Sequence, residues 1–348
     1  MLKLLRIALL PFSFLFGIIA RIRNLFYDNG ILKSFNVPVK VVSVGNVTVG
    51  GTGKTPTVIY LVKLLRRLGK RPGILSRGYG RKSKGFKLVF DGSVFNCDVS
   101  NCGDEIILEV HNTKVPAAVC EDRVEGALKL IEAAEIDTIV LDDAFQHRRI
   151  GRNADVVLLD QDFLLDGSPL DKLPLPSGLF REPISSLKRA DAVIINRKFS
   201  VEKKIPENVM KILDGKNVFY AHYEIEGLFD VKDYKYFPVE EFTGQKSLVA
   251  AGIAKPESFL YTLKSVGIDV TNRLIFKDHK NYENKDVQKI RKQFYETNAY
   301  SVITTEKDAV KLINFSKELD DIDIYFIRIK LVLKDENEFV KFLQLNIN

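Results

Sequence analysis

A glycine-rich segment that could hold phosphate is the strongest chemical signal in the sequence. It reads Gly45-Asn-Val-Thr-Val-Gly-Gly-Thr-Gly-Lys-Thr55, after an apolar run and before a helical pattern. Glycines let backbone N–H groups turn inward around phosphate oxygens, and a helix N-terminus adds partial positive charge. Strand, loop and helix in this order are the setting of a P-loop. The residues expected to contact nucleotide are Val49, Gly50, Gly51, Thr52, Gly53, Lys54 and Thr55.

Two of these residues have expected roles in phosphate chemistry. Lys54 would reach the β- and γ-phosphates, and the Thr55 hydroxyl would bind magnesium. The strict pattern has glycine where Thr48 stands, so Gly50 and Gly51 must supply the flexibility. The alternative is a glycine-rich turn beside an ordinary surface lysine, but the strand-loop-helix setting favours phosphate.

A P-loop enzyme also needs a carboxylate for magnesium, usually at the end of a neighbouring strand. The run Asp137-Thr-Ile-Val-Leu-Asp-Asp143 ends in two acids, so Asp142 or Asp143 is the candidate. Asp160, after the apolar run 156–159, is a rival. The alternative for the pair is a structural role as carboxylates that cap a strand.

Guanine specificity is not indicated. GTPases usually read guanine with Asn-Lys-x-Asp after a strand. Asn196-Arg-Lys-Phe199 lacks the final Asp, and Thr305-Glu-Lys-Asp308 lacks the Asn. ATP is therefore the expected nucleotide.

Several further polar residues are weaker candidates for contact with substrate or phosphate. An arginine can grip a phosphate with two parallel hydrogen bonds, although each could equally form a structural ion pair. These candidates are Arg77, Arg81, Arg123, Gln146, His147, Arg181 and Glu182.

The elements that must position these residues read as α/β. Short apolar runs, several without polar interruption, alternate with helical patterns, as in strands covered on both faces. We expect a P-loop NTPase-type sheet with helices on both faces, a second, smaller α/β domain, and an N-terminal membrane-associated helix. Residues 85–102 resemble a hairpin, and residues 162–190 a long functional loop. The expected divisions are 1–28, 29–225 and 226–348.

The N-terminus carries an uncharged run, 7–20, between Arg6 and Arg21. It is shorter than the roughly 20 residues that cross a bilayer. A signal peptide is disfavoured because arginines follow at once without a small-residue cleavage site. We expect an interfacial helix with Lys3, Arg6, Arg21 and Arg23 at lipid head groups; a buried core helix is the alternative.

The charge distribution is uneven. Residues 1–90 hold 17 Lys and Arg but one acid, Asp28, so this quarter carries +16 while the whole chain carries +7. A basic face of this kind indicates an anionic partner. Lipid is favoured over nucleic acid, because no aromatic ladder interleaves the basic residues and there is no Trp. The three cysteines lack zinc-site spacing and are expected to be buried, reduced thiols.

A resemblance to a known family rests on nine short motifs in a fixed order. They are SVGNVTVGGTGKTP (43–56), LSRGYGR (75–81), GDE (103–105), EDR (121–123), DDAFQHRR (142–149), LPSGLFREP (175–183), AGIAKPESF (251–259), DH (278–279) and TEKDAVKL (305–312). In these the chain resembles the tetraacyldisaccharide 4'-kinases, the lipid A 4'-kinases of Gram-negative bacteria. It departs from the family pattern at Ala144, where Gly is common, and at Lys280, where a His or aromatic residue often follows.

The resemblance implies a specific reaction. The family transfers the ATP γ-phosphoryl, with Mg²⁺, to the 4'-hydroxyl of an acylated disaccharide 1-phosphate, giving lipid IVA. It implies a peripheral or monotopic enzyme on the cytoplasmic face of the inner membrane. The expected partners are this substrate and anionic membrane lipid, with no nucleic acid and no obligate protein partner. It also implies that Asp104 is the catalytic base and that His279 supports it.

Chemistry makes that pair reasonable. A sugar hydroxyl is a poor nucleophile, and a carboxylate within hydrogen-bond reach can orient it and accept its proton. A histidine bound to the carboxylate would fix its orientation. Three rivals remain: a P-loop GTPase or metal-insertion ATPase acting on a protein, a membrane-bound scaffold without catalysis, and a soluble small-molecule kinase.

Overall fold

The computed structural model describes residues 2–278 and 280–347. The chain forms two compact units, Met1–Tyr223 with Leu331–Asn348, and Glu224–Lys330. It passes between them in two long strands, β8 (Asn217–Asp230) and β13 (Ile324–Leu333).

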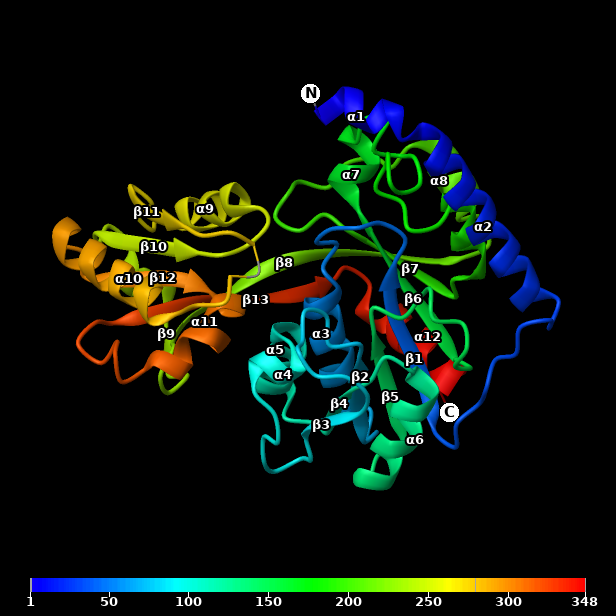
Figure 1. Ribbon diagram of the computed structural model, residues 1–348, viewed down its shortest axis with the longest axis horizontal. Coiled ribbons are helices and arrows are strands. Elements are labelled where there is room, and N and C mark those ends of the chain that lie inside the picture. The colour runs from blue at the N-terminus through cyan, green and yellow to red at the C-terminus, as the bar shows by residue number, and fades with distance from the viewer. Residues whose placement is uncertain (1, 279, 348) are drawn as a thin grey trace. The chain divides into compact units, whose positions relative to one another are not determined.

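The first unit is built on a nearly all-parallel sheet (Figure 1). The strand order is β8-β7-β6-β1-β5-β2-β4-β3, and only β3 is antiparallel to its neighbour. The other strands are β1 (Lys40–Asn46), β2 (Pro72–Ser76), β3 (Lys87–Phe90), β4 (Ala117–Val119), β5 (Thr138–Asp142), β6 (Ala154–Asp160) and β7 (Ala192–Asn196).

Helices cover both faces of this sheet. Leu130 packs on one face with Leu75 and Leu141, while Ile74 and Val140, which point to the opposite face, are also fully buried. The helices are α1 (Leu2–Ala8), α2 (Leu10–Asp28), α3 (Lys54–Arg67), α4 (Val99–Cys102), α5 (Asp104–Thr113), α6 (Arg123–Ala133), α7 (Gln161–Asp166), α8 (Glu207–Ile212), α12 (Glu336–Ile347) and the 3₁₀ helix η1 (Ile184–Arg189).

The second unit is a smaller α/β body. Its strands run in the order β11-β10-β12-β13 and are parallel, while β9 pairs antiparallel with β8. Its elements are β9 (Tyr236–Phe237), β10 (Ser247–Ala251), β11 (Asn272–Ile275), β12 (Ser301–Thr305), α9 (Pro256–Ser265), α10 (Asn284–Thr297), α11 (Glu306–Leu312) and the 3₁₀ helices η2 (Val239–Phe242) and η3 (Ile313–Phe315).

The division expected from sequence, 29–225 and 226–348, differs from these units in the last residues of the chain. Helix α12 returns to the first unit, where Phe339 packs edge-on against Phe219 and the Glu336 carboxylate accepts a 2.7 Å hydrogen bond from Tyr60. Periodicity indicates that this helix exists but not which sheet receives it.

The sequence predicts a hairpin over residues 85–102, but only part of this segment forms one. β3 turns back through a bridge between Phe90 and Phe95, but helix α4 then begins because the Asp98 side chain accepts from the Asn101 N–H. This helix brings Cys102 to Cys97, and the two form a disulfide. The expectation of reduced thiols is therefore wrong for this pair, whereas Cys120 is free and buried.

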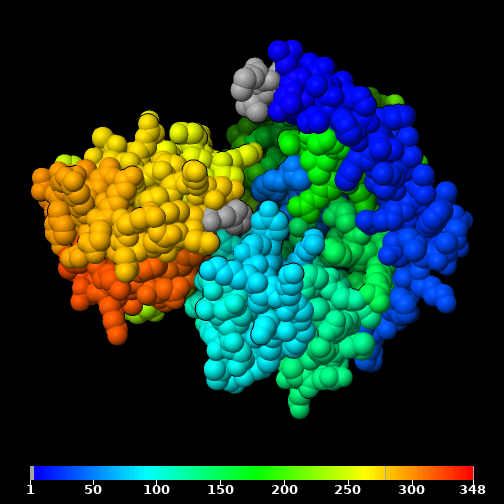
Figure 2. All heavy atoms as spheres, viewed as in Figure 1, coloured from blue at the N-terminus to red at the C-terminus, as the bar shows by residue number. Residues whose placement is uncertain are grey.

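The N-terminal run is helical but is not a core helix. In α2 only Ser13 and Gly17 are buried, whereas Phe12, Phe14 and Ile19 are 61%, 71% and 58% exposed. The atoms of α1 and α2 form a continuous ridge along the edge of the first unit, dark blue in Figure 2. Within the described residues, no helix is both long enough and apolar enough to cross a membrane.

Candidate active site

The candidate residues of the first unit gather where its parallel strands end. In a parallel sheet the carboxyl ends of the strands share one edge, where ligands of α/β folds bind. Val44 of β1 pairs with Asp142 of β5, so the glycine-rich loop starts level with the two candidate magnesium acids. Strand β2 ends at the same edge with Ser76, and β7 ends there with Asn196.

The glycine-rich loop has the backbone that its sequence predicts. Gly50 and Gly53 have φ angles of 106° and 102°, in the region that side-chain-bearing residues avoid. The first half of the loop pairs with the 175–183 segment: Thr48 bridges to Phe180, and the Val49 N–H donates to Leu179 at 2.8 Å. The missing glycine at position 48 thus lies in this pairing, outside the turn that Gly50 and Gly53 make.

Two residues that the sequence does not assign to the phosphate site, Asn196 and Tyr223, support this loop. The Asn196 side-chain amide donates to the Thr52 carbonyl at 3.2 Å and to the Tyr223 hydroxyl at 3.0 Å. Both side chains lie against Gly53, where an added Cβ would stand 2.2 Å from the Tyr223 oxygen. Asn196 therefore supports the phosphate loop. This structural role explains why β7 ends in an Asn although the rest of the guanine-reading motif Asn-Lys-x-Asp is missing.

Asp143 joins the loop to the 175–183 segment. Its carboxylate lies 3.7 Å from the Lys54 ammonium and accepts from the Arg181 guanidinium at 2.8 Å. Burial pushes the pKa of Asp143 upward, but Lys54 and Arg181 outweigh burial and leave the pKa below its ordinary value. Asp143 is thus ionised and paired at neutral pH.

Asp142 stands in the opposite electrostatic setting. One carboxylate oxygen accepts from the Ser76 hydroxyl at 2.9 Å, and the other is buried with no hydrogen-bond partner. Burial, with the nearby carboxylates Glu105 and Asp143, raises the pKa of Asp142 to about 7. A buried carboxylate with an unpartnered oxygen and a surplus of negative neighbours is a fitting place for a cation.

Glu109 adds a third carboxyl that the sequence does not reveal. It lies on α5, is fully buried, and neither of its carboxylate oxygens has a hydrogen-bond partner. Burial and then the neighbouring Asp142 raise its pKa well above the ordinary value. The sequence does not identify Glu109 as a candidate, because a glutamate on the buried face of a helix has the same residue type as the many glutamates on exposed faces.

Asp104 begins α5, directly after Gly103 with a φ of 99°. It is only 6% exposed. Its neighbour Glu105 lies close enough to Asp142 to raise the pKa of that carboxyl, so the first turn of α5 lies beside the two candidate magnesium acids. The expected partner, His279, lies outside the described residues, as does the side chain of Lys3.

Arg123, a cation, and His147, a neutral imidazole at neutral pH, lie next to these acids. Both line a pocket of about 300 Å³. Burial, followed by the charges of Arg123 and Arg77, lowers the pKa of His147 to about 4. The Arg123 guanidinium donates to the Cys120 carbonyl at 2.5 Å, while its Nε and Nη2 are buried and unpartnered. An arginine with unused buried donors suits an anionic group.

Other candidates have structural contacts. The Arg81 side chain is nearly fully buried and pairs with Glu121 at 2.7 Å. Glu182 pairs with Arg189 at 2.6 Å, and the Gln146 amide donates to the Asn46 carbonyl at 2.8 Å. The rival acid Asp160 caps α7 and pairs with Lys198 at 2.5 Å, so it is less suited to magnesium than Asp142 or Asp143.

The donor set fits a nucleotide held with magnesium. Throughout residues 2–278 and 280–347, no three or more His, Cys, Asp or Glu side chains gather as a metal cage. Magnesium does not require one, because it usually takes one or two carboxylates and completes its shell with phosphate oxygens and water. Thr55, Asp142 and Asp143 would hold Mg²⁺, and the loop 49–55 would hold ATP phosphates.

Comparison with known proteins agrees with this geometry. The family described as tetraacyldisaccharide-1-P 4'-kinase matches residues 5–348. A tetraacyldisaccharide 4'-kinase of Chlorobium luteolum is 35% identical over 88% of this chain and 87% of its own length. One from Chlorobaculum parvum is 38% identical over 86% and 82%. The crystal structure of LpxK from Aquifex aeolicus in complex with ATP matches with a TM-score of 0.84 and 32% identity, covering 99% of this chain and 100% of that one.

Proposed function

The chain belongs to the tetraacyldisaccharide 4'-kinase family, and on that basis we propose how its own residues carry out the family's reaction. The protein is a kinase of lipid A biosynthesis. It transfers the γ-phosphoryl group of ATP to the 4'-hydroxyl of tetraacyldisaccharide 1-phosphate, forming lipid IVA. The substrate is a lipid disaccharide, and the cofactor is Mg²⁺.

The first proposed role is that of the base. Asp104 accepts the proton of the substrate's 4'-hydroxyl. As it does so, the hydroxyl oxygen bonds to the γ-phosphorus, and the bond between the γ-phosphorus and the bridging oxygen of the ADP leaving group breaks. Its support is the position of α5, whose next residue, Glu105, lies beside Asp142. His279 is proposed to orient Asp104, on the strength of the family motif alone.

The second proposed role is the handling of phosphate charge. Lys54 and Arg181 bracket Asp143, and in the nucleotide-bound enzyme these cations are available to the β- and γ-phosphates. Asp142, with its unpartnered oxygen, is proposed as the principal protein ligand of magnesium, with Thr55. When bound, Mg²⁺ neutralises charge on the phosphates during transfer.

The third proposed role is recognition of the substrate's anionic group. Arg123, with two buried and unpartnered donor atoms, lines the same pocket as His147. Arg77 is exposed and close enough to lower the pKa of both residues. This cluster is suited to a phosphate on the disaccharide.

We also propose that α1 and α2 attach the enzyme to the cytoplasmic face of the inner membrane, peripherally, at anionic lipid. The support is the exposure pattern of α2, in which the small residues are buried and the large apolar residues are exposed. Ser13 and Gly17 are buried, whereas the exposed side chains include Phe12, Phe14 and Ile19. An exposed apolar face of this kind marks a contact with lipid or another apolar surface. No obligate protein partner is part of this proposal.

The observation that carries the proposal is the convergence of Lys54, Arg181 and Asp143 with buried Asp142 beside α5. The test is transfer of γ-phosphate from ATP to purified tetraacyldisaccharide 1-phosphate in detergent micelles, by the intact protein and by Asp104→Asn. The matched control is Asp98→Asn, which removes a carboxylate six residues earlier and keeps a good helix cap.

We expect Asp98→Asn to match the intact protein and Asp104→Asn to lose about a hundredfold or more in kcat, the usual scale for a positioned base. ATP binding should survive in both variants. Equal activity of the two variants would refute the role of Asp104. No labelled lipid from folded, ATP-binding intact protein would refute the function itself.

A further inference from the structure

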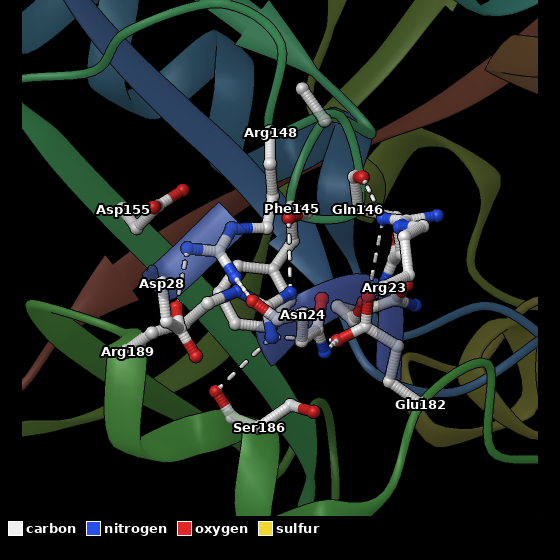
Figure 3. Close-up of polar contacts among 12 residues, drawn as sticks. Arg23, Asn24, Asp28, Phe145, Gln146, Arg148, Asp155, Glu182, Ser186 and Arg189 are labelled. Carbon is white, nitrogen blue, oxygen red and sulfur yellow. Dashed lines mark hydrogen bonds and ion pairs between the residues drawn. The ribbon is translucent and has the colours of Figure 1, made fainter. Parts of the chain in front are cut away.

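The C-terminal half of α2 is hydrogen-bonded to the loops of the active site. Arg23 donates to the Gln146 carbonyl and lies 3.7 Å from the Glu182 carboxylate. The Asn24 amide donates to Glu182 at 3.2 Å. Figure 3 shows these side chains converging on the chain segments around Gln146 and Glu182. A helix that only anchors the enzyme to a membrane does not need these contacts.

Arg148 also holds the C-terminal half of α2. Its guanidinium donates to the Asn24 carbonyl at 2.9 Å and to the Asp28 carboxylate at 2.7 Å, and it lies over the Tyr27 ring. Because Arg148 belongs to the 142–149 segment, this segment contacts α2 at both Gln146 and Arg148. The two contacts fix the helix relative to the segment that begins with Asp142 and Asp143.

Gln146 connects this contact to the phosphate loop. Its carbonyl accepts from Arg23, while its side-chain amide donates to the Asn46 carbonyl at 2.8 Å. The Asn46 side chain in turn donates to the Thr52 hydroxyl inside the loop at 2.8 Å. An unbroken series of polar contacts therefore runs from α2 to the loop that holds the nucleotide.

Glu182 connects the helix to Asp143. Its carboxyl side chain is only 3% exposed, and a buried carboxylate must be paired to remain charged. Asn24 and Arg23 supply two of its partners, and Arg189 supplies the third at 2.6 Å. The preceding residue, Arg181, is the one that binds Asp143. A shift of Glu182 would therefore move Arg181 relative to the phosphate site.

We infer that Arg23 and Asn24 are positioning residues for phosphoryl transfer, acting through Gln146 and Glu182 on the segments that carry Asp143 and Arg181. The inference rests on the proposed function. It gives the membrane helix a second role, because the element that meets the lipid surface also sets the geometry of the phosphate site. Neither residue needs to touch ATP or the disaccharide.

The helix supplies a matched control for the test. Arg21 lies two residues before Arg23 on α2; it is exposed, and within the described part of the chain it makes no polar contact. Arg21→Ala and Arg23→Ala each remove one positive charge from the same helix, so both should weaken attraction to anionic lipid alike. Only Arg23→Ala removes contacts to Gln146 and Glu182.

The experiment measures transfer to acylated disaccharide 1-phosphate in mixed micelles, with ATP, lipid and Mg²⁺ varied in turn. For Arg23→Ala and Asn24→Ala we expect a kcat about tenfold below that of Arg21→Ala, an increased Mg²⁺ concentration for half-maximal rate, and a lipid KM within about twofold. Arg23→Lys should recover part of kcat, because an ammonium can still donate to the Gln146 carbonyl.

A second measurement does not depend on activity. Amide hydrogen exchange in 142–149 and 181–189 should be faster in Arg23→Ala than in Arg21→Ala. Equal kcat, equal Mg²⁺ dependence and equal exchange in these two variants would overturn the inference while leaving the kinase function intact. Absence of transfer by the intact protein would overturn the function, and this inference with it.

Discussion

One nitrogen of the Arg181 guanidinium lies 2.8 Å from both carboxylate oxygens of Asp143, a residue 38 positions earlier in the chain. Asp143 also lies 3.7 Å from Lys54. The phosphate loop, the acidic strand end and the 175–183 segment therefore meet at one carboxylate. Its neighbour Asp142 makes no such ion pair among the described residues, and one of its oxygens has no partner.

This difference predicts unequal effects for the two acids. Asp142→Asn should raise the Mg²⁺ concentration for half-maximal transfer by about tenfold or more, because it removes the oxygen best placed for the cation. Asp143→Asn should reduce kcat with a smaller change in Mg²⁺ dependence, because it mainly frees Lys54 and Arg181. The measurement is a Mg²⁺ titration of initial rate at saturating ATP. The reverse order of effects would assign magnesium to Asp143.

Gly53 makes the phosphate loop sensitive to a single methyl group. A Cβ there would lie 2.2 Å from the Tyr223 hydroxyl and 2.5 Å from the Asn196 amide, at a φ of 102°. Gly53→Ala should therefore displace the loop and weaken ATP binding by about tenfold or more, in addition to the backbone strain of roughly 1–2 kcal/mol. Binding of a fluorescent ATP analogue measures this.

The control for this variant is Gly215→Ala. Gly215 also has a positive φ, 71°, but an added Cβ would meet nothing within 4 Å. It shares the backbone strain without the collision, so it should lose stability and retain ATP affinity. Equal ATP affinity in the two variants would show that the loop can move away from Tyr223 and Asn196 at little cost.

His147 predicts a specific dependence on pH. Burial and the charges of Arg123 and Arg77 lower its pKa to about 4 in the folded protein, whereas an unfolded chain has a pKa near 6.5. As the pH falls from about 6.5 toward 4, the unfolded chain binds this proton and the folded protein does not. Folding stability should therefore fall across this window, by up to about 1.4 kcal/mol per pH unit.

The comparison that isolates this residue is His147→Gln, which cannot ionise. Between about pH 7 and pH 5, the free energy of unfolding should decrease less for His147→Gln than for the intact protein. The same variant assigns the imidazole signal by NMR, which should not titrate above about pH 5. An imidazole that titrates near 6.5 would show that the cationic neighbours are screened from it.

Sequence predicts the phosphate loop and its acids because both are short, local patterns. The strand before Gly45, the helix from Lys54 and the strand at 138–141 follow from apolar patterns alone, and the structure confirms them as β1, α3 and β5. The acid pair is read directly from the residues that follow this last strand. By contrast, Arg181 and Asp143, which are in contact, are 38 residues apart in the sequence, and Asn196 and Gly53 are farther apart still. Periodicity carries no information on which distant side chains meet.

Buried polar groups are the hardest to predict. Glu109 and Asn196 have ordinary polar residue types, and their burial depends on how α5 and β7 pack. The disulfide between Cys97 and Cys102 likewise depends on the Asp98 cap that turns the chain into α4. Conversely, the N-terminal helix can be predicted from the sequence, because the uncharged run 7–20 between Arg6 and Arg21 is a local pattern.

The exposed face of α2 leads to a prediction about the membrane. Phe14 is 71% exposed, whereas Ser13 and Gly17 of the same helix are buried. Its burial in the lipid boundary would contribute about 2–3 kcal/mol. Phe14→Glu should therefore reduce binding to vesicles of anionic phospholipid by about tenfold or more. Leu345→Glu is the control, since Leu345 is 86% exposed on α12.

Vesicle flotation separates two explanations for this apolar face. If α2 enters the lipid boundary, Phe14→Glu stays in the soluble fraction and Leu345→Glu floats with the intact protein. If the face instead meets a second protein or another copy of the chain, neither change alters flotation, and Phe14→Glu changes the mass of the particle in detergent-free solution. The lipid explanation also requires that lowering the anionic lipid fraction weaken binding of the intact protein, because Arg21 lies on the same exposed helix.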